Sequence, residues 1–258
     1  MVKDQINNES KVEEKEKEGL KILEEEQKLV KERLKEWIPK TKLGNMVKDG
    51  KITSIEQIFA NGYKILEYEI IDYLIPDIKV EFIKLGLSVG KYRRPKIVKM
   101  VRRKTAEGDK PSWVALAVIG NENGYVGVGL GKSYDIPLAM QKAVRKAKLN
   151  IIPIGRGCGA WECGCGQPHS IPFKVEGKQG SVKVIFLPAP FGTGLVAPDE
   201  IKKLLRLAGI KDIWMKSFGQ TRKKINFIFA AFKALKKTTE YRIKEEYSEL
   251  LGLRFGLI

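Results

Sequence analysis

Cysteine and histidine are scarce in this sequence. Among 258 residues there are three cysteines and one histidine, and all four lie between Cys158 and His169. An odd number of cysteines within one short stretch is not the framework of a disulfide-stabilised secreted protein. With a single histidine and no paired carboxylates at a motif spacing, the sequence also offers no convincing set of catalytic groups. We therefore expect a protein that is not an enzyme, with metal or thiol chemistry in one loop.

Long apolar runs are also missing. No segment approaches the roughly 20 apolar residues that span a bilayer. The first residues, Met1-Val-Lys-Asp-Gln, lack the apolar stretch of a signal peptide. No helical pattern combines a basic face with an apolar face deep enough to insert into a membrane surface. We therefore expect a soluble, cytoplasmic protein without a membrane partner.

Negative charge is in short supply. The sequence has 48 Lys and Arg against 31 Asp and Glu, a formal net charge of +17. Because such an excess repels itself in a compact chain, it indicates a polyanionic partner, and nucleic acid is the first candidate. Hydrophobic residues make up 43% of the chain, enough for a core and for one or two domains.

The clearest local pattern is a glycine-rich stretch from Gly120 to Ser133, followed by a helical pattern from Ile136 to Leu149. Asn123-Gly124 lies between two apolar runs, and Asn-Gly tolerates the positive φ angles of a type I′ hairpin turn. In the second strand of this hairpin glycine recurs at every other position. One side of that strand is bare, so another backbone or a phosphate can come close. These glycines are candidate RNA contacts: Gly127, Gly129 and Gly131.

The helix predicted after that strand is amphipathic. Its apolar residues recur at the 3.6-residue period from Ile136 to Ala147 and predict packing on a sheet. Its opposite face is basic, and such residues are either a solvated surface or contacts to phosphates. The candidate phosphate contacts are Lys142, Arg145 and Lys146, together with Lys132 on the glycine-rich strand.

A kinase-like, nucleotide-binding enzyme is the alternative for this stretch. The phosphate loop of nucleotide hydrolases needs glycine five residues before Gly131, where the sequence has Val126. The dinucleotide fingerprint needs glycine three residues after Gly129, where the sequence has Lys132. Because both motifs fail by one residue, we favour an RNA-binding protein over this alternative.

A helix near residues 67–74 and three strands are expected before the glycine-rich stretch. The strands are Val80–Ile83, Ile97–Val101 and Trp113–Ile119, and a turn-rich loop from Arg102 to Ser112 separates the last two. The order helix, three strands, helix matches the α-β-β-β-α domain that recognises double-stranded RNA by shape and phosphates. Four cations beside the loop are candidate RNA contacts, with plain solubility as the other interpretation: Arg102, Arg103, Lys104 and Lys110.

The second half of the chain predicts a two-layer α/β domain. Strands are expected at Ile171–Val175, Val182–Leu187 and Ile213–Phe218, and helices at Pro198–Ala208 and Ile225–Leu235. The whole chain is therefore expected to have an α+β fold. Its parts are a charged amphipathic helical extension (1–38), a basic lead-in loop with short helices near Ile55–Phe59 and Glu67–Leu74 (39–77), a double-stranded-RNA-binding-like domain (78–152), a Cys/His-rich linker loop (153–170), the two-layer α/β domain (171–239) and a C-terminal tail (240–258).

The Cys/His-rich loop is a candidate metal site. Cys158, Cys163, Cys165 and His169 are separated by four, one and three residues, and four such ligands suffice for one structural zinc ion. The single residue between Cys163 and Cys165 is tighter than in a standard zinc finger, although the glycines between them and beside them allow sharp bends. The alternative is a buried, reduced loop whose thiols pack as small apolar groups.

Several of these stretches together resemble a known family. The run from Gly120 to Ser133, the helix from Ala139 to Lys148 and Asn150-Ile-Ile-Pro are similar to the universal small-subunit ribosomal protein S-five family. Leu187 to Val196 and Leu207-Ala-Gly-Ile resemble the second domain of that family. Arg156 to Phe173 is most similar to archaeal members.

The resemblance implies a structural protein of the small ribosomal subunit that binds small-subunit rRNA and supports assembly. It further implies a position where messenger RNA enters the subunit, help in unwinding its structure, an influence on decoding accuracy, and no small-molecule substrate. Arg156 joins the candidate RNA contacts. By the same resemblance, the surface toward a neighbouring ribosomal protein consists of Gly192, Thr193, Gly194 and Lys202.

Overall fold

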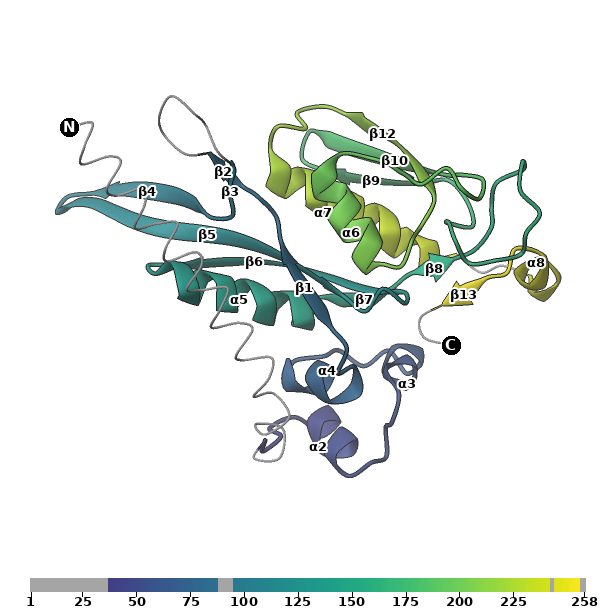
Figure 1. Ribbon diagram of the computed structural model, residues 1–258. Helices are drawn as coiled ribbons and strands as arrows, with labels where there is room; N and C mark the ends of the chain where they lie inside the picture. Colours follow the sequence, from purple (N-terminus) through teal and green to yellow (C-terminus); the bar gives the residue numbers. More distant parts are fainter. Residues whose placement is uncertain (1–36, 88–94, 242–243, 256–258) are drawn as a thin grey trace. The chain divides into compact units, whose positions relative to one another are not determined.

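The structure is a computed structural model that describes residues 37–87, 95–241 and 244–255 (Figure 1). The predicted helical extension therefore lies almost entirely outside the described residues. The chain forms an α+β fold with two compact units. The first unit extends to Ile78 and adds Phe82–Ala117 and Gly129–Asn150. The second contains Lys79–Glu81, Val118–Val128 and everything from Ile151 onward.

The first sheet has five strands, in the order β1-β5-β6-β7 with β4 also paired to β5. They are β1 (Lys79–Phe82), β4 (Lys99–Thr105), β5 (Gly108–Gly120), β6 (Tyr125–Ser133) and β7 (Ile151–Pro153). The end of β5 is buried from Val114 onward, whereas β4 is exposed along its whole length. The β4–β5 pairing, from Lys99 opposite Val114 to Thr105 opposite Gly108, therefore forms an antiparallel ribbon outside the core.

Helix α5 (Ile136–Leu149) covers the bare side of β6. Its first turn contains Pro137, and its buried residues include all those that the helical period predicted, with Ala139 in addition. A Cβ atom at Gly129 would overlap backbone atoms of Ala143 and Ala147, and one at Gly131 would overlap Ala139 and Ala143. The backbone of the chain's own helix thus lies on the bare side of β6, where the sequence predicted another backbone or a phosphate. Contact of these two glycines with RNA stays a prediction. Gly127 is buried too, opposite Ile151 of β7.

Replacing Gly131 with alanine is expected to lower the free energy of unfolding by at least about 2 kcal/mol. The added methyl group would meet the helix backbone, which cannot yield without displacing α5 from the sheet. Chemical denaturation followed by circular dichroism measures the loss. Gly164→Ala is the matched control, because a Cβ atom there enters open space. Equal losses in the two variants would contradict this account of the packing.

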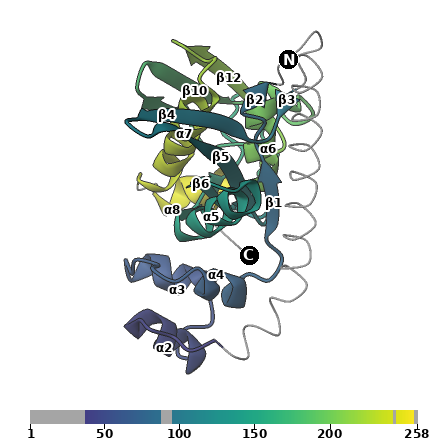
Figure 2. The same cartoon turned by 90° about the vertical axis from the view of Figure 1, so that its left-hand side faces the viewer.

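Three short helices precede the first sheet: α2 (Lys42–Lys48), α3 (Ile55–Ala60) and α4 (Glu69–Leu74) (Figure 2). The last two confirm the predicted short helices. The first corrects the prediction of a basic loop, because Thr41 caps α2 by accepting the backbone N–H of Gly44. A short hairpin, β2 (Gly86–Leu87) with β3 (Pro95–Lys96), follows β1.

Two further local predictions for the first sheet are corrected. The turn between β5 and β6 is not a two-residue Asn-Gly turn, since Glu122 and Gly124 have the positive φ angles and the Asn121 Oδ1 atom accepts the N–H groups of Asn123 and Tyr125. The predicted loop from Arg102 to Ser112 is largely strand, because the pairing of β4 with β5 continues as far as Thr105 and Gly108.

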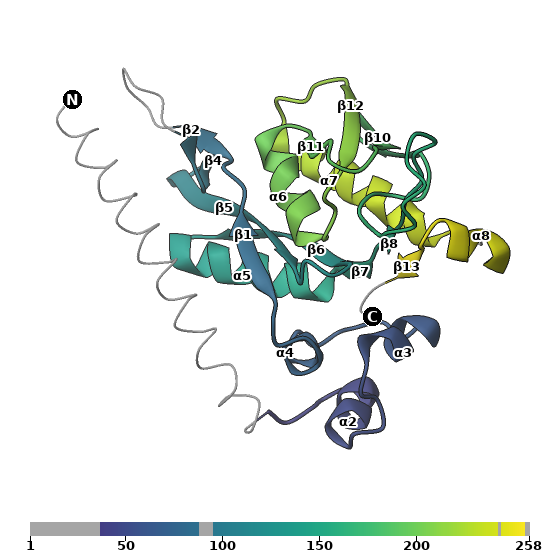
Figure 3. The ribbon, with the colours of Figure 1, turned by 45° about the vertical axis from the view of Figure 1, so that its right-hand side comes forward.

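The second sheet has the order β11-β12-β10-β9. Its strands are β9 (Val175–Gln179), β10 (Val182–Pro188), β11 (Leu195–Val196) and β12 (Ile213–Phe218), and its helices are α6 (Asp199–Leu207), α7 (Lys224–Lys236) and the short η1 (Lys237–Thr239). Helix α7 lies along β9 and β10 and beside α6 (Figure 3). The predictions for α6, α7, β10 and β12 are confirmed. The strand expected at Ile171–Val175 instead begins at Val175, because it pairs with β10 from Val175 to Gln179.

The C-terminal tail folds back onto its own unit. It contains α8 (Glu245–Leu250) and β13 (Arg254–Phe255), and β13 pairs with β8 (Gly155–Arg156). The N–H of Cys158 donates to the carbonyl oxygen of Leu251, 2.8 Å away. The tail therefore supports the start of the Cys/His-rich loop.

Candidate metal centre and nucleic-acid interface

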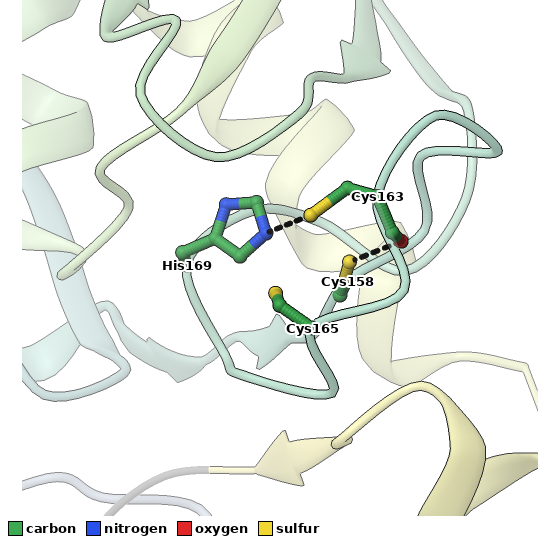
Figure 4. Close-up of side chains that lie close together, drawn as sticks. All are labelled: Cys158, Cys163, Cys165 and His169. Carbon is green, nitrogen blue, oxygen red and sulfur yellow. Dashed lines mark hydrogen bonds between the residues drawn. The ribbon is translucent and has the colours of Figure 1, made fainter.

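The three cysteines and the histidine converge on one point of the linker loop (Figure 4). Their candidate ligand atoms all lie within 4.8 Å of one another, and the Cys163 Sγ atom is 3.9 Å from the His169 Nε2 atom. Around a tetrahedral zinc ion, neighbouring ligand atoms are about 3.5–3.8 Å apart. All three cysteines are free thiols. The loop can thus hold a metal ion after only small movements of its side chains.

The ring of His169 is held so that its Nε2 atom faces the sulfur atoms. The Nδ1 atom on the other side lies 2.9 Å from the Oδ2 atom of Asp212, and both residues are buried. A carboxylate accepts from Nδ1–H, which leaves a lone pair on Nε2 for a metal ion. The ring of Phe191 lies edge-on to the imidazole, with the ring centroids 5.6 Å apart.

The thiols differ in their electrostatic surroundings. Burial raises the pKa of the Cys158 thiol to about 11, so this group keeps its proton at neutral pH without a metal ion. Hydrogen bonding, first from the backbone N–H of Phe191, lowers the pKa of the Cys163 thiol to about 6. A metal ion deprotonates the thiols that coordinate it.

This set of candidate ligands would suit a structural metal ion and not a catalytic one. Three sulfur atoms and one imidazole nitrogen are soft and borderline ligands, which suit zinc and not magnesium or calcium. Four protein ligands complete a tetrahedral shell, so no position remains for a water molecule or a substrate.

The basic ribbon, which we define as residues 99–112 of β4 and β5, carries cations on both of its faces. Arg103 lies directly opposite Lys110, so these two side chains point to the same face. Arg102 and Lys104 alternate with Arg103 and point to the other face. All four are exposed, and none of them takes part in an ion pair between described residues.

The basic face of α5 is partly occupied by contacts within its own unit. The guanidinium group of Arg145 lies 5.3 Å from the ring centroid of Tyr68, and the Lys142 Nζ atom is 3.3 Å from the Ser133 Oγ atom. A neighbouring cation, Lys148, forms an ion pair of 2.6 Å with Asp72 of α4. The predicted phosphate contacts at Lys132, Lys142, Arg145 and Lys146 all remain exposed.

Arg156 is not a surface cation. Its side chain is buried in β8, with the guanidinium nitrogens 3.4 and 3.5 Å from the Asn123 Oδ1 atom. Burial lowers the pKa of this guanidinium below its usual value, and Arg254 opposite it adds to the effect. Contact of Arg156 with RNA stays a prediction, although its side chain has little exposed surface.

The predicted protein-contact residues lie on the loop before β11 and at the start of α6. Gly192 and Gly194 have φ angles of +89° and +73°, which explains why both are glycine. Gly192 is exposed, while the N–H of Gly194 donates to the Oδ1 atom of Asp212 at 2.7 Å. Lys202 is partly exposed, 3.6 Å from Asp199.

Comparison with known proteins places both halves of the chain in one family. Residues 96–155 match the N-terminal domain of ribosomal protein S5, and residues 177–248 match its C-terminal domain. The small ribosomal subunit protein uS5 of Nanoarchaeum equitans is 53% identical over 225 residues, which cover 87% of this chain and 97% of that protein. The chain belongs to the uS5 family. The uS5 of Thermofilum pendens is 50% identical over 212 residues, covering 82% and 98%, and that of Ignicoccus hospitalis is 51% identical over 206 residues, covering 80% and 92%.

Membership of the uS5 family makes the chain a structural protein of the small ribosomal subunit and not an enzyme. The resemblance to archaeal members of this family is confirmed, and the kinase-like alternative is wrong. Among the described residues, no helix has both the length and the apolar character needed to cross a membrane.

Asp212, the partner of His169 in the Cys/His-rich loop, was not predicted from the sequence. It lies 43 positions after His169, immediately before β12, and no short motif connects the two. The only local signal is an acidic residue followed at once by the buried strand residue Ile213. That signal is too common to identify a partner for a histidine.

Proposed function

We propose that this uS5 chain binds small-subunit rRNA through the basic ribbon and through Lys132, Lys142, Arg145 and Lys146. The observation that carries the proposal is the exposed pair of like charges, Arg103 and Lys110, held directly opposite each other. Like charges in such a pair destabilise a strand pairing unless an anion lies between or beside them. Phosphates of folded RNA provide such anions on both faces of a ribbon that enters a groove.

We propose that the RNA-binding part of the chain is a double-stranded-RNA-binding-like domain over residues 78–152. The metal-binding linker at 153–170 and the α/β domain at 171–239 follow it. The family matches at 96–155 and 177–248 support this division. The three antiparallel strands β4, β5 and β6 followed by α5, with α4 earlier in the chain, support the comparison with domains that read the shape of double-stranded RNA, although β1 and the short hairpin of β2 and β3 are additional strands between α4 and β4.

We further propose that Gly192, Thr193, Gly194 and Lys202 contact a neighbouring protein of the small subunit. Family membership supports this contact, an influence on decoding accuracy, and a position in the cytoplasmic ribosome where messenger RNA enters. The exposure of Gly192 and its lack of a side chain allow a partner to approach the backbone closely.

The metal ion that we propose for Cys158, Cys163, Cys165 and His169 is one zinc ion with a structural role. The convergence of four ligand atoms within 4.8 Å supports it. Because the loop has few apolar residues of its own, a metal ion would hold it in place of a core.

Crosslinking in purified small ribosomal subunits tests the proposed interface. We expect RNA crosslinks at residues 99–112 and 132–146, and crosslinks from Lys202 to a second protein. RNA crosslinks that fall elsewhere in the chain, with none in these two stretches, would contradict the proposed RNA surface. The absence of any protein crosslink from Lys202 would contradict the protein contact alone.

A further inference from the structure

We propose that Asp212 is an outer-sphere ligand of the metal site and that, through Asp212, the bound metal ion holds the loop of Gly192, Thr193 and Gly194 in place. The inference rests on the metal site proposed above and adds a residue and a consequence to it. Asp212 would be a positioning residue, because it contacts the ligand His169 and not the metal ion.

The first step of the argument is the buried carboxylate itself. Asp212 and His169 are each only 3% exposed, and a buried carboxylate is costly unless both of its oxygen atoms have partners. One oxygen lies 2.9 Å from the Nδ1 atom of His169, and the other accepts the N–H of Gly194 at 2.7 Å. A metal ion on the far side of the imidazole makes Nδ1–H a stronger donor, which favours this buried pair.

The second step concerns the orientation of the ring. If Nδ1 carries the hydrogen, Nε2 is unprotonated and can coordinate a metal ion; the opposite tautomer cannot. The carboxylate of Asp212 selects the first tautomer, since it only accepts hydrogen bonds. The carbonyl oxygen of His169 also accepts the N–H groups of Lys211 and Asp212, so the two residues are fixed to each other through backbone and side chain.

The third step connects this pair to the glycine loop. The N–H of Gly194 donates to the Oδ1 atom of Asp212, and the carbonyl oxygen of Gly194 accepts the N–H of Ile213 at 3.2 Å. Phe191 reaches the imidazole of His169 from the other end of the loop. Both ends of the segment 191–194 therefore contact the His169–Asp212 pair, Phe191 through the imidazole ring and Gly194 through the carboxylate. Because the contacts are contiguous, a loss of metal that frees the ring also loosens the loop.

Coupling of this kind is reciprocal. If the metal ion stabilises the loop conformation, then any protein that binds this conformation raises the affinity for the metal ion by the same factor. The metal site would thus favour the loop conformation that the proposed protein contact requires.

A conservative variant separates the roles of the carboxylate. Asp212→Asn preserves the size of the side chain, but an amide can accept from only one of the two N–H groups. We expect the zinc affinity of the full chain, measured by competition with a chelator, to fall by roughly 10- to 100-fold. Asp199→Asn is the matched control, because its side chain is 95% exposed in the same unit. Its zinc affinity should equal that of the wild type.

Hydrogen exchange of the wild-type chain provides a second measurement that does not depend on a variant folding. Removal of zinc is expected to speed exchange at the amide of Gly194, and Asp212→Asn with zinc bound should show the faster rate as well. A wild type that binds no zinc would overturn the metal site itself. A wild type that binds zinc, with the affinity unchanged in Asp212→Asn or with Gly194 exchange unaffected by the metal ion, would overturn only the inference about Asp212.

Discussion

Replacing Arg102, Arg103 and Lys104 together with alanine is expected to reduce the salt dependence of rRNA binding. Each phosphate contact contributes roughly 0.7 to 0.9 to the slope of log K against log salt concentration, so three contacts contribute roughly 2 to 3. Between 50 and 200 mM salt the wild type should therefore lose roughly 20- to 40-fold more affinity than the variant. Filter binding or fluorescence anisotropy with small-subunit rRNA fragments, at several salt concentrations, measures both slopes.

The fold should survive this change, because β4 is exposed along its whole length and buries nothing in the core. Surface substitutions of this kind typically change stability by less than about 0.5 kcal/mol. The matched control replaces three exposed lysines of the second unit, Lys178, Lys216 and Lys236, and removes the same charge. Equal slopes for the two triple variants would mean that the ribbon acts only through net charge, and an unchanged slope would exclude phosphate contacts by its cations.

Elements with a strong hydrophobic period could be predicted from the sequence. The helices α5 and α7 bury apolar residues that recur at the helical period, and the strand β10 buries alternate residues, as its sequence predicts. The extension of β4 through Arg102, Arg103 and Lys104 has no such pattern, because neither of its faces is buried. Its strand conformation depends on hydrogen bonding to β5, and the residues of β4 alone do not predict that pairing.

For the glycine-rich strand, the sequence predicted a close approach but not the group that makes it. Alternate glycines correctly indicated that something comes close to the bare side of β6. They do not specify what approaches, because a helix backbone and a phosphate both need the same space. The answer depends on where α5 packs, and that placement brings Ala143 to both Gly129 and Gly131.

The convergence of the four candidate metal ligands was predictable for the opposite reason. All four candidate ligands lie within a stretch of 12 residues, from Cys158 to His169, so bringing them together closes only a short loop at a small cost in chain entropy. The partner of the histidine was not predictable, since Asp212 reaches it only after β9, β10, β11 and α6 have been placed. Residues that support a metal ligand commonly come from such distant parts of a sequence.

Removing two of the candidate ligands, with Cys163→Ser and Cys165→Ser in one chain, is expected to abolish binding of one zinc ion per chain. The wild type should also become less stable when zinc is removed by a chelator. At a free zinc concentration 1,000 times the Kd, binding to the folded state stabilises it by about 4 kcal/mol. For a chain of this size that corresponds to a rise in Tm of roughly 8 to 16 °C. Metal analysis and thermal unfolding with and without zinc measure the two effects.

The double variant should unfold at the temperature of the chelated wild type and should not respond to added zinc. Glu162→Gln is the matched control, because Glu162 is exposed in the same loop and is not one of the converging ligands. This variant should retain one zinc ion and the full response. Magnesium should not replace zinc for the wild type, since it prefers oxygen ligands in octahedral geometry. If the double variant and the wild type contain the same amount of zinc, or if both melt alike after chelation and after zinc addition, the loop holds no structural metal ion, and its thiols pack as small apolar groups.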